Sequence, residues 1–127
     1  MAAIPTPRPR RLLVVDDETL MRSMLSDVLT RLGYSVEQAE SGEVAMTHFR
    51  PDRYQVVITD LVMPRMNGLE LARRIRQVDR AVPIILFTGT TGTSDIEEAW
   101  RSGLVVLHKP LTITALQQAL EAACRPA

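Results

Sequence analysis

The sequence predicts an α/β fold, with one parallel β-sheet of five strands and helices on both of its faces. Three observations support this. From Arg11 onward, short apolar runs rich in β-branched residues alternate with longer segments of helical period. The first run, RLLVVDD, is apolar at consecutive positions, which is typical of strands buried on both faces. The length of 127 residues suits one domain with one core.

The first half of the chain contains two strands and two helices by this pattern. RLLVVDD (11–17) is the first strand, and Gly33 comes where a left-handed helix C-cap would lie. YSVEQA (34–39) is a shorter second strand. Ser41 can cap a second helix that must end near Pro51. The first helix is indicated by apolar residues at helical spacing, namely Leu20, Met21, Met24, Leu25, Val28, Leu29 and Leu32.

The second half continues the alternation with three strands and three helices. The strands are YQVVITD (54–60), VPIILFTG (82–89) and LVVLHK (104–109). A Met63-Pro64 turn precedes the third helix, Ser94 and Glu97 match a capping box for the fourth, and Thr112 can cap the fifth. Right-handed crossovers between parallel strands make a flavodoxin-like, doubly wound (βα)5 fold with strand order 2-1-3-4-5 the natural expectation.

Composition narrows the class of protein. Fifteen basic and fifteen acidic side chains give a net charge of zero, so electrostatics give no reason to expect direct nucleic-acid binding. No stretch approaches about 18 consecutive apolar residues, so membrane insertion is not expected. A single cysteine, Cys124, fits a reducing compartment, and we expect a cytoplasmic protein. Residues 1–10 are expected to form a flexible proline-rich lead-in, 11–124 the domain and 125–127 a tail.

Polar side chains stand at the ends of four of the five expected strands. The carboxyl ends of parallel strands meet at one edge of a sheet, where ligands bind near the point at which strand order reverses. These side chains should therefore lie close together although they are far apart in sequence. They are Asp16 and Asp17, Asp60, Thr88 followed by Gly89, and Lys109.

Three crowded carboxylates repel one another and need a compensating cation at neutral pH. Mg²⁺, or Mn²⁺, suits such oxygen ligands, and a carboxylate can also attack phosphorus as a nucleophile. Each residue has an ordinary alternative taken alone, since acids cap helices and a lysine is usually solvated. Their coincidence at one edge is what favours a phosphoryl-transfer site.

Several other residues are expected to be structural. The methionines Met21, Met24, Met46 and Met66 should fill gaps in the core. Trp100 should pack on the fourth helix. Two histidines, His48 and His108, lack partners at metal-ligand spacing and are taken as non-catalytic.

Four blocks of the sequence, LLVVDDE, VVITDLVMPRMNGLEL, PIILFTG and HKPL, resemble the signature of response-regulator receiver domains of two-component signalling, including chemotaxis regulators. The resemblance covers roughly residues 11 to 123. It implies that Asp60 is the phosphoacceptor. It also implies a metal site formed by Asp16 (directly or through water), Asp17, Asp60 and the backbone carbonyl of Val62, and phosphoryl coordination and switching by Thr88, Gly89 and Lys109.

The resemblance also implies a function. Such a domain takes a phosphoryl group from a histidine kinase, a phosphotransfer protein or a small donor such as acetyl phosphate. It is a signalling module that catalyses only its own aspartyl phosphorylation and dephosphorylation, not an enzyme with an outside substrate. Phosphorylation repacks the face formed by helix 4, strand 5 and helix 5, which a downstream protein then reads.

Two departures from the receiver pattern bear on the switch. Receivers commonly carry an aromatic residue three positions before the lysine, and here that position is Val106. The segment GLVVLHKP is also one residue shorter than usual between Gly103 and the lysine. We hypothesise that coupling between phosphorylation and this face is weakened or rerouted.

Three other classes of protein fit this sequence less well than the receiver does. A magnesium-dependent hydrolase with an aspartyl-phosphate intermediate usually needs a second acid two residues after the nucleophile, where this chain has Val62. A flavodoxin-like cofactor binder needs a glycine- and hydroxyl-rich phosphate loop, whereas the first loop reads DDETLM. An adaptor that signals without phosphorylation usually lacks an acid or the lysine. The sequence leaves open the cognate kinase, the target and whether the domain stands alone or belongs to a longer regulator or hybrid kinase.

Overall fold

The computed structural model describes residues 10–89 and 94–124, so most of the expected lead-in and all of the expected tail lie outside the described residues. Strands and helices alternate strictly along the chain. They are β1 Arg11–Val15, α1 Thr19–Arg31, β2 Ser35–Ala39, α2 Gly42–His48, β3 Val56–Asp60, α3 Gly68–Val78, β4 Ile84–Thr88, α4 Ser94–Arg101, β5 Val105–His108 and α5 Ile113–Ala123. No helix in this part of the chain is long and apolar enough to cross a bilayer.

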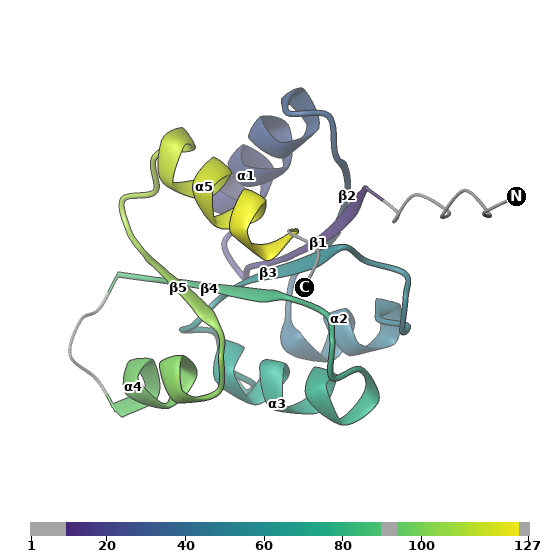
Figure 1. Cartoon of the computed structure of the whole chain (residues 1–127), viewed down its shortest axis with the longest axis vertical. Helices are drawn as coiled ribbons and strands as arrows, with labels where there is room; N and C mark the ends of the chain where they lie inside the picture. Colours follow the sequence, from purple (N-terminus) through teal and green to yellow (C-terminus); the bar gives the residue numbers. More distant parts are fainter. Residues whose placement is uncertain (1–9, 90–93, 125–127) are drawn as a thin grey trace, which may run out of the picture.

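The five strands form one parallel sheet in the order β2-β1-β3-β4-β5, which confirms the predicted flavodoxin-like fold. In register, Val15 is paired with Thr59, Asp60 with Phe87, and Thr88 with His108. Helices α1 and α5 cover one face of the sheet, and α2, α3 and α4 cover the other (Figure 1). The carboxyl ends of the central strands therefore open at one common edge.

The core consists of two apolar clusters, one on each face of the sheet. Successive residues of a strand belong to opposite clusters: Leu12 and Val14 face α1 and α5, whereas Leu13 and Val15 face the other helices. All five residues of β3 and all five of β4 are buried. The continuous apolar runs in the sequence thus reflect strands covered on both faces.

The predicted helix ends are largely confirmed. The side chains of Ser41 and Thr112 accept hydrogen bonds from the backbone N–H groups of Val44 (3.1 Å) and Ala115 (3.0 Å). Gly33, after α1, has a φ of 98° as expected for a left-handed cap. Helix α4 begins at Ser94, but the residue before it lies outside the described residues, so the capping box there stays a prediction.

Two packing predictions were wrong. The side chain of Met24 is 61% exposed and that of Trp100 is 57% exposed, whereas Met66 is buried as expected. In α1 the apolar residues form a stripe wider than the surface that the sheet can cover, and burial is limited to the part around Leu25 and Leu29. Trp100 falls just outside the stripe of α4 that contacts the sheet.

The turn between β3 and α3 is fixed by a very close approach at Gly68. Its N–H donates to the carbonyl oxygen of Leu61 at 2.8 Å. A Cβ at this position would lie 2.2 Å from the carbonyl oxygen of Asp60 and 2.8 Å from Cδ2 of Leu86. Asn67 caps α3 by accepting from the N–H of Glu70 at 2.8 Å, as expected for this turn. The first turn of α3 therefore rests directly on the backbone of Asp60.

Replacing Gly68 by alanine tests this contact. We expect Gly68→Ala to lower the free energy of unfolding by about 1 to 3 kcal/mol because the added methyl overpacks the turn, although alanine favours helix. Urea denaturation measures the change. The matched control is Gly89→Ala, where the nearest atom to an added Cβ is Cδ of Lys109 at 3.9 Å, an ordinary contact. Equal stability of Gly68→Ala and wild type would contradict the close approach.

Candidate functional site

Three carboxylates meet at the carboxyl edge of the sheet, as the sequence predicts. Asp16 and Asp17 follow β1, and Asp60 ends β3. Each offers one oxygen, and these oxygens all lie within 4.8 Å of one another. Asp16 is fully buried and Asp60 is 3% exposed, whereas Asp17 is exposed. This cluster, Asp16, Asp17 and Asp60, is the acidic cluster of the site.

Asp60 is held on both of its carboxylate oxygens. Its Oδ2 lies 3.2 Å from Nζ of Lys109, and its Oδ1 accepts from the N–H of Val62 at 3.2 Å. The ammonium of Lys109 also lies 5.3 Å from the centre of the Phe87 ring, within the range of a cation–π contact. These contacts leave the position of the Asp60 carboxylate little freedom.

Asp16 is the member of the acidic cluster whose surroundings least favour a charged carboxylate. Its pKa is raised to about 6, chiefly by burial and also by the nearby charge of Asp60, and the hydrogen bond from the N–H of Glu18 (3.0 Å) opposes the rise. Its Oδ1 accepts that bond from Glu18, but its buried Oδ2 has no hydrogen-bond partner among the described residues. A buried oxygen without a donor is costly unless a cation or water satisfies it.

The acidic cluster fits a divalent cation. Mg²⁺ takes hard oxygen ligands and typically uses one or two carboxylates together with water and phosphate oxygens. The cluster supplies that donor chemistry, and Oδ2 of Asp16 provides a buried oxygen that a cation would satisfy. The residues present are therefore suitable for Mg²⁺ or Mn²⁺.

The other predicted site residues also come to this edge. Thr88 is the fully buried last residue of β4, and its carbonyl oxygen accepts from the N–H of Lys109 at 2.8 Å. Gly89 follows Thr88 and is exposed. Val62 lies in the turn after β3 with its side chain 63% exposed. Their roles toward a phosphoryl group remain predictions.

Val106, the position where receivers commonly carry an aromatic side chain, lies in the middle of β5. It is paired with Leu86 of β4, is half-buried and packs against the cluster on the α2, α3 and α4 face. Its neighbours Val105 and Leu107 pack on the opposite cluster.

Two features of the site were not predicted from the sequence. The first is the need for glycine at position 68, which comes from the contact with Asp60 described above. An exposed apolar groove of about 170 Å³ lies between α1 and the start of α5, and its lining includes Met21, Met24, Pro110 and Ile113. The surplus of apolar residues in the first helix was the signal for it. Because α1 and α5 begin shortly after Asp17 and Lys109, this α1–α5 groove lies beside the acidic cluster.

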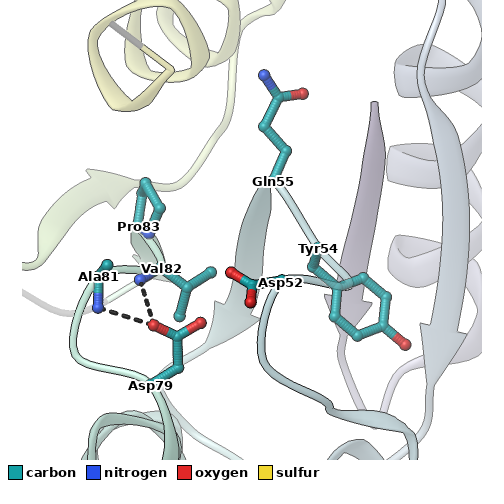
Figure 2. A pocket seen from close by; sticks show the side chains of 7 residues that line it. All are labelled: Asp52, Tyr54, Gln55, Asp79, Ala81, Val82 and Pro83. Carbon is teal, nitrogen blue, oxygen red and sulfur yellow. Dashed lines mark hydrogen bonds between the residues drawn. The ribbon is translucent and has the colours of Figure 1, made fainter. Parts of the chain in front are cut away.

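A separate hollow of about 210 Å³ lies at the opposite, amino edge of the sheet (Figure 2). Its residues come from the loops that precede β3 and β4. The carboxylate of Asp79 accepts from the N–H groups of Ala81 (2.8 Å) and Val82 (3.3 Å), so it serves the loop before β4. This hollow is separate from the acidic cluster and is lined by Asp52, Tyr54, Gln55, Asp79, Ala81, Val82 and Pro83.

Comparison with known proteins supports the family that the sequence resembles, over most of the described chain. The family model of the response regulator receiver domain matches residues 12–121. The virulence sensor protein BvgS of Bordetella bronchiseptica is 42% identical over 92% of this chain, and the response regulator MprA of Mycolicibacterium vanbaalenii is 35% identical over 92%. The match covers 10% of BvgS and 51% of MprA, so the chain spans about half or less of these relatives.

Solved structures of receiver domains have the same fold as this chain. A response regulator receiver domain protein from Clostridium thermocellum superposes with a TM-score of 0.84 at 28% identity, covering 90% of this chain and 93% of that one. Chemotaxis protein CheY4 of Vibrio cholerae superposes with a TM-score of 0.77 at 31% identity, covering 89% and 97%. With the family model matching residues 12–121 and the predicted strand order in place, the chain belongs to the response regulator receiver domain family of two-component systems.

Proposed function

We propose that the chain is a phosphoacceptor receiver domain in which Asp60 carries the phosphoryl group. The observation that carries the proposal is the position of Asp60, which ends a fully buried strand between the Lys109 ammonium and two further carboxylates. The domain would act in the cytoplasm, consistent with its single cysteine, and would bind proteins rather than nucleic acid. It would serve as a stand-alone regulator or as the receiver part of a longer regulator or hybrid kinase.

In this proposal an oxygen of the Asp60 carboxylate attacks the phosphorus of the donor. The bond from phosphorus to the donor breaks as the acyl-phosphate bond forms. The electron pair of the broken bond leaves with the donor, on the imidazole nitrogen of a phosphohistidine or on the acetate of acetyl phosphate. Lys109, which lies 3.2 Å from Asp60, is proposed to neutralise charge on the transferred oxygens, and the Thr88 hydroxyl and Gly89 N–H are proposed to bind them.

Mg²⁺ bound at the acidic cluster would supply positive charge to the phosphoryl oxygens. Asp17, Asp60 and the carbonyl of Val62 are the proposed direct ligands, with Asp16 binding directly or through water. The chain's own contribution is to hold these oxygens close together despite their repulsion. The hydrogen bond from Val62 N–H to Asp60 also fixes the turn that presents the Val62 carbonyl.

A protein donor must contact the surface beside Asp60 to bring its phosphohistidine to the carboxylate. The α1–α5 groove is an apolar surface beside the acidic cluster, since its two helices begin shortly after Asp17 and Lys109. Met24 and Ile113 are 61% and 55% exposed there. We therefore propose that the histidine kinase or phosphotransfer protein docks on this groove.

The downstream protein is proposed to read the face formed by α4, β5 and α5. Trp100 lies two positions after Glu98, which pairs with Arg73 of α3. At about 100° per residue, Trp100 is turned away from α3. Its exposed ring could therefore contribute to the α4–β5–α5 face. Val106 lies under that face with a stiff, β-branched side chain, and we propose that it transmits phosphorylation weakly.

Phosphorylation by a small donor tests the central proposal. Incubation with acetyl phosphate and Mg²⁺ should add one phosphoryl group to wild type, seen by intact mass, and none to Asp60→Asn. EDTA should abolish labelling, and Asp17→Asn should slow it by about tenfold or more because a metal ligand is lost. Failure of wild type to gain mass with any phosphodonor would favour an adaptor that signals without phosphorylation.

Docking on the α1–α5 groove is tested by placing a charge in it. With a histidine kinase or phosphotransfer protein that labels wild type, Met24→Glu should reduce the rate of transfer by about tenfold, as expected for loss of an apolar contact at an interface. Labelling by acetyl phosphate should stay unchanged, since a small donor needs no groove.

The matched control for this test is Val78→Glu. Val78 is an apolar residue with 52% exposure on α3, outside the groove. Equal losses in the two variants would mean that the groove is not the donor surface.

Weak coupling is tested by NMR with beryllofluoride, which mimics the phosphoryl group. Addition with Mg²⁺ to the ¹⁵N-labelled chain should shift amides near Asp60 strongly but those of β5 and α4 only slightly, because Val106 has no ring to move. Asp60→Asn should show none of these shifts. Large changes throughout α4 and β5 would contradict the hypothesis.

A further inference from the structure

A cavity of about 390 Å³ lies between α3 and the turn that joins α4 to β5, away from the acidic cluster. Helices α3 and α4 lie beside each other on one face of the sheet (Figure 1). The floor of the cavity is apolar and buried, since Leu69, Ala72 and Leu104 are 2%, 2% and 5% exposed. Its rim is polar, with Arg73, Arg76 and Ser102 among the lining residues.

Arg76 is the unusual residue of this cavity. It is half-buried, and its Nη1 donates to the carbonyl oxygens of Arg80 (3.2 Å) and Val82. No carboxylate of the described residues lies within ion-pair distance of it, and no hydrogen bond within the described part of the chain uses its Nε or Nη2. Burial lowers the pKa of this guanidinium, and the charge of Asp79 opposes the shift. Arginine nevertheless stays charged, so a cation without a close counter-ion lines the cavity.

Arg73 differs from Arg76 although both line the cavity. Its Nη1 lies 3.2 Å from Oε2 of Glu70, and its Nη2 pairs with Glu98 of α4. Both pairs are exposed, and such pairs contribute little to stability. Arg73 is therefore already neutralised, while the positive charge of Arg76 is available to a ligand.

We propose that this cavity binds a small organic carboxylate with a flat apolar body. The carboxylate would pair with the free side of the Arg76 guanidinium, which is suited to bidentate contact, and the apolar body would lie on Leu69, Ala72 and Leu104. The volume is at the lower end of the range of small-molecule sites, and one available cation matches one carboxylate. A peptide would need a longer groove and further anchors. The inference does not depend on phosphorylation of Asp60.

An NMR titration of the ¹⁵N-labelled full chain with biphenyl-4-carboxylate tests the proposal, with the neutral biphenyl-4-carboxamide as the matched probe. The carboxylate should shift amides in residues 69–77 and 102–104 and should bind at least about fivefold more tightly than the carboxamide, because an ion pair replaces a neutral contact. Equal affinities, shifts confined to the α1–α5 groove, or no saturable shifts would overturn the proposal.

Substitutions test whether Arg76 is the cation that binds the carboxylate. Arg76→Gln should weaken carboxylate binding by at least about fivefold and leave carboxamide binding unchanged. Ser102→Glu places a like charge at the exposed rim and should have the same effect, which guards against a folding defect of Arg76→Gln. The control is Arg74→Gln, which removes an equal charge from an exposed position of α3 that pairs with Glu70 and does not line the cavity. An equal loss in Arg74→Gln would show general charge attraction and refute the assigned site.

Discussion

Three carboxylates within 4.8 Å of one another, with one ammonium 3.2 Å from the most central of them, are the constraint on which this structure depends. Such crowding is unfavourable in a chain free to relax, because the charges would separate. Here Asp16 and Asp60 cannot separate, since each is fixed to the end of a strand buried in the sheet. The fold thus holds three carboxylates together against their mutual repulsion, and the proposed divalent cation would offset that repulsion.

The rest of the molecule can be understood as support for that arrangement. Apolar clusters on both faces fix β1 and β3 side by side, and Lys109, which follows the edge strand β5, reaches Asp60 across the end of β4. Gly68 brings the first turn of α3 against the carbonyl of Asp60. The surfaces proposed for the donor and the downstream partner lie on helices around this fixed centre, so their side chains can differ without disturbing it.

Much of the fold and of the acidic cluster was predictable from the sequence, because strands buried on both faces appear as continuous apolar runs. The five strands, their order and the meeting of Asp16, Asp17 and Asp60 were predicted correctly, since parallel strands bring their ends to one edge. The exposure of Met24 and Trp100 was not predicted, because helical spacing identifies the apolar stripe of a helix but not how much of that stripe the sheet covers. The close approach of Gly68 to the carbonyl oxygen of Asp60 depends on how the turn between β3 and α3 packs against Leu86 of β4, which the sequence pattern does not show.

The backbone and the side chain of Val62 are constrained to very different degrees. Its backbone is fixed, because its N–H is bonded to the Asp60 carboxylate inside a turn closed by Gly68. The residue itself, in contrast, is 63% exposed, so its side chain lies largely outside the core. We expect substitution there to change the surroundings of the Asp60 carboxylate at a small cost to folding. Under the proposed function, Val62 is therefore a position at which the side chain beside the phosphoacceptor can vary while the backbone that holds the acidic cluster stays the same.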